Sequence, residues 1–235
     1  MTPTLALDHI TVTAPTLEAG IEHVRACLGV EVPPGGAHIQ MGTHNRLMRL
    51  GEDEFLEIIA VDPAASAPGR PRWFALDRYR IEPPRLRTWI VRTPDLDAAL
   101  AESRPSVGVA TGITRGSLTW RISIPDDGSM PFEGAHPMFI QWPGEPFPGA
   151  RMADLGCRLV RLSIEHPNAA EIADRLAPVF ADDRVTFREE PRMPALGRDP
   201  DSGWRPDIGV VAWPIATAGM RDDFAALQHS PWLVG

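Results

Sequence analysis

The amino-acid sequence predicts an α+β protein built from repeated modules of one strand, one helix and two or three further strands. Two observations carry this prediction. Strand-like segments with alternating faces lead into amphipathic helices, and this unit returns at similar intervals along the chain. The length and composition agree with this prediction, because 235 residues with 43% hydrophobic and 23% charged side chains are typical of a globular protein.

The first unit sets the pattern. Residues 5–13 alternate as a strand does, with Ile10 and Val12 on one face and a second face formed by Leu7, His9, Thr11 and Thr13. Thr16 is a favourable N-cap and Gly29 a favourable stop for a helix. Between them, apolar residues recur at helical spacing, namely Leu17, Ile21, Val24 and Leu28. We therefore expect a strand that leads directly into a helix.

The same order of elements returns twice. A strand at 89–91 precedes the capping residue Asp95, and a strand at 159–164 precedes the capping residue Asn168. Glu171 stands three residues after Asn168, which predicts a capping box. A proline comes shortly before each of the three predicted helices, at Pro15, Pro94 and Pro167. The chain is therefore predicted to contain three related units.

Each unit also ends in a similar way. Three alike segments are predicted closing strands, at 55–59, 139–143 and 210–214. Further strand candidates precede the first two of them, at 45–50 and 118–124. Stretches rich in proline and glycine are predicted loops, at 62–71, 143–149 and 191–204. These boundaries predict modules at residues 1–83 and 84–149 and a shorter third module at residues 150–235.

The charged residues exclude several classes of function. The net charge is −8, which disfavours nucleic acid as a partner because its binding depends on clustered cations. The sequence contains no lysine. Schiff-base enzymes, pyridoxal-phosphate enzymes and Walker-type phosphate loops all need that amine. A small molecule is the expected partner, and arginine is the residue available to bind an anionic group.

Targeting and cysteine patterns indicate a cytoplasmic protein. The first ten residues lack a basic and apolar leader, and no run of about 18 apolar residues predicts a membrane span. Cys27 and Cys157 lie far apart and outside any metal-binding spacing. We therefore expect no disulfide framework, no zinc ribbon and no membrane partner.

Several segments resemble the glyoxalase-like domain family of the vicinal-oxygen-chelate superfamily. In the first half they are LDHITV at 7–12, GTHNRL at 42–47, FLEII at 55–59 and RWFALD at 72–77. In the second half they are WRISIP at 120–125, FIQW at 139–142 and LSIEHP at 162–167. The resemblance implies paired βαβββ modules whose curved mixed sheets enclose a cleft. In relatives that use a metal, a divalent ion in this cleft chelates oxygens of the substrate.

The resemblance also implies where metal ligands would lie, in the first and closing strands of each module. His9 and Glu57 match these positions, and this pair suits Zn, Fe, Ni, Co or Mn. The corresponding residues are Thr88 and Gln141 in the second module, and Arg161 and Ala212 in the third. Because neutral oxygens are weak ligands, any single ion should be held weakly by His9 and Glu57. The alternative is a hydrogen-bonded histidine and a carboxylate paired with an arginine.

Without a metal, Glu57 and His9 remain the candidate catalytic pair, with Glu57 as a general base. An ion pair that only orients strands is the alternative. The candidate substrate-binding residues are Asn45, Thr88, Trp120, Arg121, Gln141 and Trp142. The structural alternatives are a turn residue for Asn45, a surface arginine for Arg121, and core or module-interface residues for Trp120 and Trp142. His38 and His44 are predicted to be loop residues.

Two functions follow from these residues. The first is a lyase, isomerase or dioxygenase-type enzyme acting on a small oxygen-rich molecule. The second is a protein that binds or sequesters such a molecule without catalysis. A third module leaves one unit unpaired, which predicts a homodimer. The alternative is a monomer in which the third module covers its own chain.

Overall fold

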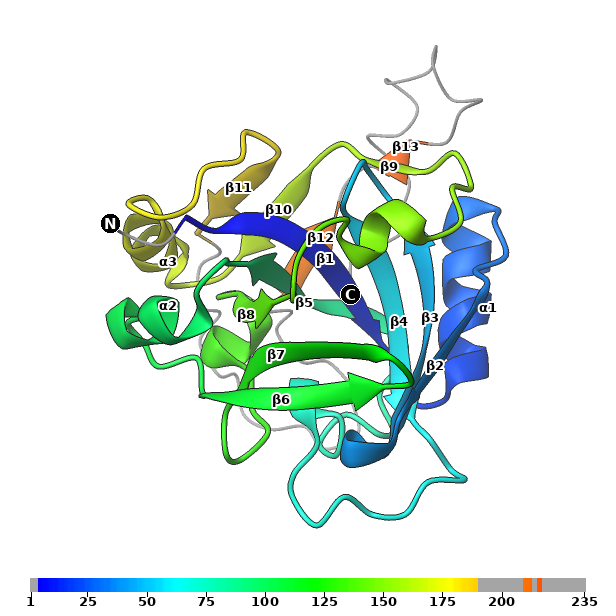
Figure 1. The fold of residues 1–235 in the computed structure, drawn as a ribbon. Coiled ribbons are helices and arrows are strands. Elements are labelled where there is room, and N and C mark those ends of the chain that lie inside the picture. Colours follow the sequence, from blue (N-terminus) through cyan, green and yellow to red (C-terminus); the bar gives the residue numbers. More distant parts are fainter. Residues whose placement is uncertain (1–3, 190–208, 213–214, 217–235) are drawn as a thin grey trace, which may run out of the picture.

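The structure is a computed structural model that describes residues 4–189, 209–212 and 215–216 (Figure 1). The first five long elements are β1 (Ala6–Thr13), α1 (Leu17–Leu28), β2 (Pro34–His38), β3 (Thr43–Arg49) and β4 (Phe55–Val61). The next five repeat that order: β5 (Arg85–Arg92), α2 (Leu96–Glu102), β6 (Val109–Arg115), β7 (Leu118–Ile124) and β8 (Met138–Gln141). Short 3₁₀ turns connect them at Ile39–Met41, Trp73–Ala75, Pro131–Gly134 and Pro148–Arg151.

The remaining elements form a smaller unit. They are β9 (Arg158–Leu159), β10 (Leu162–Glu165), α3 (Ala169–Leu176), β11 (Val185–Arg188), β12 (Gly209–Ala212) and β13 (Ile215–Ala216). β10 lies between β11 and β12, and β9 pairs with β13. The predicted closing strand at 210–214 is observed as far as residue 212. Its last two residues and the predicted loop at 191–204 lie outside the described residues, and the module boundaries stay a prediction.

Eight strands form one curved mixed sheet in the order β2-β3-β4-β1-β5-β8-β7-β6. β1 is parallel to β4 and antiparallel to β5, and β5 is parallel to β8. The two edge strands come close together. Gln40, just after β2, donates from Nε2 to the Gly112 carbonyl at 3.3 Å, and its Oε1 accepts from the Thr114 amide at 2.8 Å. The predicted α+β fold with a curved mixed sheet around a cleft is confirmed.

Each face of this sheet has its own apolar core. The convex face packs against the helices through residues such as Ile10, Val12, Leu17 and Leu96. The concave face holds a second cluster that includes Ile59, Ile90, Ile122 and Ile140. Buried polar residues lie beside this second cluster, among them His9, His38, Asn45 and Glu57. The concave face therefore carries the buried polar side chains from which a functional site can be built.

Two of the three predicted helix starts are confirmed by their side chains. Thr16 Oγ1 accepts from the Ala19 amide at 3.1 Å, and Asp95 Oδ1 accepts from the Ala98 amide at 3.0 Å. The predicted cap at Asn168 is wrong. Its backbone (φ −110°, ψ 26°) is not extended, and its side chain donates to Glu171 at 3.2 Å instead of capping the helix. Glu171 also binds Arg175, so no capping box forms.

The smaller unit packs against its own chain. α3 contributes Ile172 and Leu176 to the core of the convex face. The ring centroids of Phe180 and Phe187 lie 5.4 Å and 6.3 Å from that of Trp89 in β5. The middle of the convex face, between α1 and α2, is thus covered from within the chain. This is the arrangement that the sequence offered as the alternative to pairing across a dimer.

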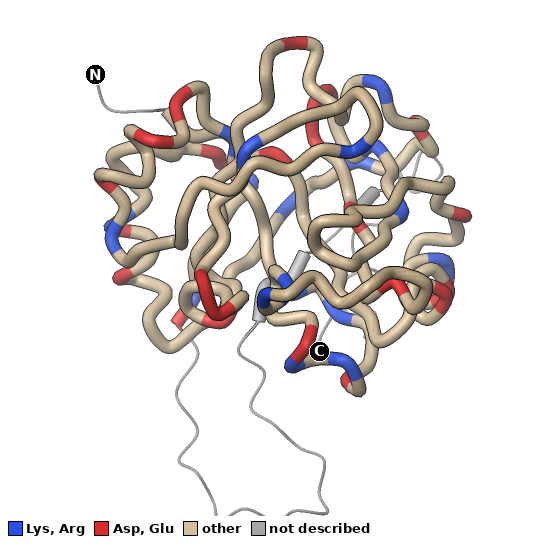
Figure 2. The backbone as a smooth tube through the Cα atoms, turned by 60° about the horizontal axis from the view of Figure 1, so that its bottom comes forward, with Lys and Arg blue, Asp and Glu red and all other residues tan. Residues whose placement is uncertain are grey.

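Charges of both signs are interspersed along the described backbone in the view of Figure 2. Many arginines bind neighbouring carboxylates, for example Arg121 with Asp97 at 2.7 Å and Arg158 with Asp154 at 2.6 Å. Within the described ranges, no helix has the length and apolar character needed to cross a membrane.

Candidate functional site

An irregularity in β1 aims the side chains of the candidate site. The pairing of β1 with β5 shifts between Leu7 and His9, which marks a β-bulge. Leu7 joins the convex core instead of sharing a face with His9, so that part of the predicted strand pattern is wrong. Neighbouring side chains of a regular strand point to opposite faces. At the bulge, Asp8 and His9 can meet instead, and bulges often re-aim side chains in this way.

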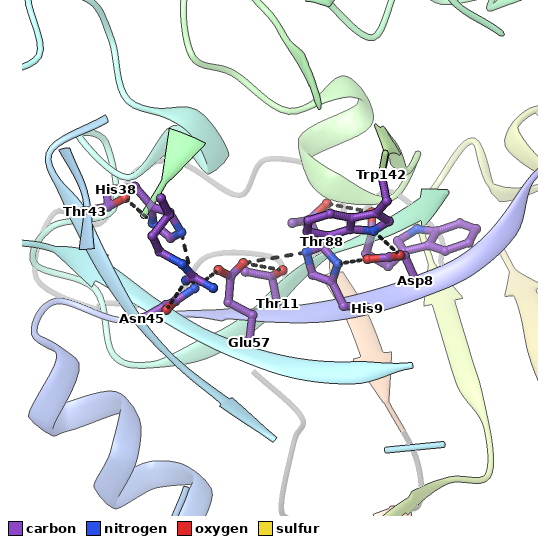
Figure 3. A network of polar contacts seen from close by, with 11 residues as sticks. Asp8, His9, Thr11, His38, Thr43, Asn45, Glu57, Thr88 and Trp142 are labelled. Atoms are coloured by element: carbon purple, nitrogen blue, oxygen red, sulfur yellow. Dashed lines mark hydrogen bonds and ion pairs between the residues drawn. The ribbon is translucent and has the colours of Figure 1, made fainter. Parts of the chain in front are cut away.

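Asp8 holds the imidazole of His9 in one orientation (Figure 3). Asp8 Oδ1 lies 2.6 Å from His9 Nδ1, and Asp8 Oδ2 accepts from Trp142 Nε1 at 2.8 Å. Because a carboxylate oxygen accepts, Nδ1 carries the proton of this bond. The His9 imidazole stacks on the Phe55 ring, with the two ring centroids 4.3 Å apart. His9 Nε2 is thereby directed toward Glu57, 3.7 Å from Oε2.

Glu57 lies on β4 with its carboxylate held by neutral donors. Asn45 Nδ2 donates to Oε1 at 2.7 Å, and Thr11 Oγ1 donates to Oε2 at 3.3 Å. Only 6% of the Glu57 surface is exposed. Among the described residues, no arginine forms an ion pair with this carboxylate. The alternative of a Glu57–arginine pair is thus not observed within the described ranges.

The four hydrogen bonds of Asn45 fix its amide orientation. Oδ1 accepts from the Gly36 amide at 2.9 Å and from Arg115 Nη1 at 3.2 Å. Nδ2 donates to Glu57 and lies 3.4 Å from His38 Nε2. Exchanging oxygen and nitrogen would place donors against donors, so the orientation follows from the network. Asn45 is a β3 residue here, and its predicted alternative as a turn residue is wrong.

His38 supports this network as a neutral ring. Its Nδ1 lies 3.1 Å from Thr43 Oγ1, and its Nε2 faces the Asn45 amide. Burial lowers the pKa of His38 to about 3, with smaller contributions from the charges of Arg115 and His44. A neutral Nε2 can accept from Asn45. His38 and His44 lie in β2 and β3, so their assignment to loops is wrong.

A small cavity of about 40 Å³ lies between these side chains. Polar residues on its wall are His9, His38, Asn45, Glu57 and Arg115, and aromatic residues include Trp73, Trp120 and Trp142. Two larger grooves adjoin it, because Trp142 lines all three spaces. One groove measures about 810 Å³ and the other about 690 Å³. The cavity and both grooves therefore lie beside the same tryptophan.

The structure brings five of the eight predicted site residues to this cavity. His9, Glu57, Asn45, Trp120 and Trp142 all line it. The rings of Trp120 and Trp142 have centroids 5.5 Å apart. Trp120 and Trp142 also line the 810 Å³ groove, so they form the wall between the two spaces.

The other three predicted residues lie elsewhere. Gln141 faces α2, where its Nε2 donates to the Pro94 carbonyl at 2.6 Å. Its neighbour Ile140 faces the cavity, so the alignment of closing strands was wrong by one residue, which reverses the face. Arg121 binds Asp97 on α2, although Arg121 and Gln141 both reach the rim of the 810 Å³ groove. Thr88 is buried opposite Thr11 and does not line the cavity.

Four site residues were not identified from the sequence: Asp8, His38, Trp73 and Arg115. Asp8 is re-aimed by a bulge that alternation does not reveal. Arg115 is the last residue of β6 and reaches Asn45 only because the sheet edges approach each other. The sequence does contain one sign of this close packing, the glycine pair Gly35-Gly36, which leaves room for the side chains of Asn45 and Arg115. A Cβ at Gly35 would lie 2.3 Å from Asn45 Oδ1, and one at Gly36 would lie 2.8 Å from Arg115 Cδ.

The residues at this site do not fit a divalent metal centre. Within the described ranges, no three histidine, cysteine or acidic side chains are placed to hold an ion. His9 Nε2 and the Glu57 carboxylate are the two ligand groups here, and the second half of the sheet adds Ile90 and Ile140 to the concave face. Thr88 and Gln141 supply no ligand there. Two protein ligands fall short of the three or four of typical zinc sites.

The chain matches the family model of the glyoxalase-like domain over residues 7–180. It therefore belongs to the glyoxalase-like domain family. No curated protein matches the sequence.

Several solved structures are similar to this chain. A hypothetical protein from Staphylococcus aureus shares 16% identity and a TM-score of 0.51, with 73% of each chain covered. Weaker matches include methylmalonyl-CoA epimerases. The Mycobacterium tuberculosis enzyme has 19% identity and a TM-score of 0.38, covering 58% of this chain and 85% of that one. A Streptomyces coelicolor epimerase in complex with 2-nitronate-propionyl-CoA has 18% identity and a TM-score of 0.39, covering 60% and 96%.

Proposed function

We propose that this protein binds a small oxygen-rich molecule on its concave face and moves a proton on it, as an isomerase or lyase. The observation that carries the proposal is the placement of the Glu57 carboxylate. It is buried, lacks an arginine partner among the described residues, and faces His9 Nε2 across 3.7 Å at the wall of a cavity. A buried carboxylate and an imidazole that face each other at the wall of a cavity are candidates for acid–base chemistry.

The residues suit a transfer next to a carbonyl group. Glu57 takes a proton from the carbon, the C–H bond breaks, and its electron pair moves toward the carbonyl oxygen. His9 Nε2 lies beside Glu57 and can give or receive a proton at a second position of the ligand. Asp8 acts on the ligand only through His9, whose ring it orients. Asn45 and Thr11 keep the Glu57 oxygens in place.

Proton transfer can be measured before the substrate is known. The protein is incubated in D₂O with a panel of small 2-oxo acids and hydroxyketones, and NMR follows the loss of C–H signals. We expect at least one compound to exchange, and Glu57→Gln to slow that exchange by about 100-fold or more, because a general base contributes about 10²–10⁴. Glu22→Gln, at an exposed ion pair on α1, is the control and should exchange normally. An unchanged rate in Glu57→Gln would contradict the proposal.

Binding without catalysis is the second candidate. It is favoured by the wall that Trp120 and Trp142 form between the cavity and the 810 Å³ groove. Such a wall suits a flat or apolar ligand. The same panel separates the two functions, because a sequestering protein would bind a compound without exchanging its protons.

A further inference from the structure

Arg115 is a cation placed at the cavity with most of its donors unused. Arg115 is the last residue of β6, and its side chain reaches the opposite sheet edge at Asn45. One of its five N–H groups donates to Asn45 Oδ1 at 3.2 Å, and its guanidinium lies 5.9 Å from the Trp120 ring centroid. No carboxylate pairs with it in the described part of the chain, whereas Arg72, Arg87, Arg92 and Arg121 each bind one.

Trp73 supplies a second unused donor on the same wall. Its indole Nε1 is buried and has no hydrogen-bond partner among the residues that the structure describes, and the residue is only 2% exposed. Leaving a buried donor unsatisfied costs about 1–3 kcal/mol. An oxygen atom of a ligand in the cavity would satisfy this donor.

The size of the cavity limits what can enter. A water needs about 10–15 Å³ of such space, so about 40 Å³ holds roughly three water-sized atoms. A carboxylate has three heavy atoms. The 690 Å³ groove shares Leu47, Arg115, Trp142, Pro148 and Met152 with the cavity, so the body of a ligand can continue into it.

We propose that the cavity is a carboxylate subsite in which Arg115 and the Trp73 indole bind the carboxylate of the ligand. This inference rests on the proposed function and names the class of its substrate, a carboxylic acid with an apolar or carbonyl-bearing body. A planar carboxylate accepts from a guanidinium through two oxygens. Bound there, it brings the adjoining carbon toward Glu57, because Asn45 contacts both Glu57 and Arg115. Gly36 leaves the space that the Arg115 stem occupies.

Binding is measured by calorimetry and NMR with three probe pairs, each a carboxylate and its neutral amide: pyruvate, benzoate and 3-phenylpropionate. We expect the wild type to bind at least one carboxylate about tenfold or more tightly than its amide. Arg115→Gln should weaken carboxylate binding about 10- to 100-fold, since hydrogen bonds to charged groups are the strong ones. Trp73→Phe, which keeps an aromatic side chain but loses the indole N–H, should weaken carboxylate binding several-fold. The carboxylate affinity of Arg115→Lys should lie between those of the wild type and Arg115→Gln, because lysine retains the charge without the two-pronged geometry.

Two variants act as controls. Arg158→Gln removes an arginine that binds Asp154 and lines neither the cavity nor the two grooves, so it should leave affinity unchanged. Glu57→Gln should retain carboxylate binding while losing exchange, so failure of the proton transfer is distinguishable from failure of the subsite. The proposal is overturned if every carboxylate binds no better than its amide, if none binds at millimolar concentration, or if Arg115→Gln and Arg158→Gln behave alike.

Discussion

Single residues determine whether this site can act. Three strands supply the central side chains of the site, which are Asp8, His9, Asn45 and Glu57. Where two polar atoms of these side chains meet, one is a donor and the other an acceptor. The exception is the 3.7 Å gap between His9 Nε2 and Glu57 Oε2. That gap is too long for a hydrogen bond. It is the place in the network where a ligand atom can be inserted.

His38 gives a prediction that depends on pH. Its folded-state pKa of about 3 lies below the ordinary histidine pKa of 6.5, so the folded protein resists protonation of this ring. The stability of the fold is therefore complete above pH 6.5 and decreases as the pH falls toward 3. The slope is about 1.4 kcal/mol per pH unit where only the unfolded state is protonated.

NMR titration of the His38 ring checks this prediction. We expect its resonances to stay constant from pH 8 to about pH 4.5, and His38→Gln to lessen the loss of stability on acidification. A midpoint near 6.5 would show that the ring is solvated and would remove its role in orienting Asn45.

The site residues also show what sequence can and cannot predict at this scale. His9, Asn45 and Glu57 were identifiable because each lies within a segment that resembles a known family. Gln141 was misplaced because a one-residue error reverses the face of a strand. Asp8 and Arg115 depend on a bulge and on contact between sheet edges, which are long-range features that local patterns do not report.

At the scale of elements, close packing of α1 against the sheet makes Gly20 a test of the fold. A Cβ at Gly20 would lie 2.4 Å from Cγ2 of the fully buried Ile58 and 3.0 Å from the Ala14 Cβ. Alanine improves helix propensity by about 1 kcal/mol, while overpacking costs about 1–3 kcal/mol. We expect Gly20→Ala to lower the free energy of unfolding by about 1 kcal/mol, measured in urea.

Gly112→Ala is the matched control, because a Cβ at Gly112 meets nothing within 4 Å. Its stability should stay within about 0.5 kcal/mol of the wild type. If Gly20→Ala were the more stable protein, the close contact between α1 and β4 would be incorrect.

The elements themselves were largely predictable. Alternating strands and amphipathic helices are local patterns, and the repeat joins them into units, so β1, α1, β3, β4, α2, β7 and α3 were expected close to their observed places. β2 was not expected, because the segment Pro34–His38 has two glycines and a proline and lacks strand propensity. It joins the sheet through pairing with β3, which is a tertiary effect.

For the whole molecule, the smaller C-terminal unit removes one reason for dimerisation. The described part of that unit covers the convex face of its own sheet through Phe180, Phe187 and α3. The homodimer expected from an unpaired module stays a prediction. Light scattering at micromolar concentration tests it, because a mass near 25.7 kDa would contradict the dimer and agree with a self-covered chain.

The central claim is that the ligand is bound on the concave face with its reacting carbon at Glu57. A crystal structure of the protein with the compound that exchanges fastest, or binds most tightly, tests this most directly. The account predicts ligand density that extends from one groove into the cavity, with an atom within about 3.5 Å of a Glu57 carboxylate oxygen. Density confined to the convex face, with the cavity around Glu57 and His9 free of the compound, would contradict it.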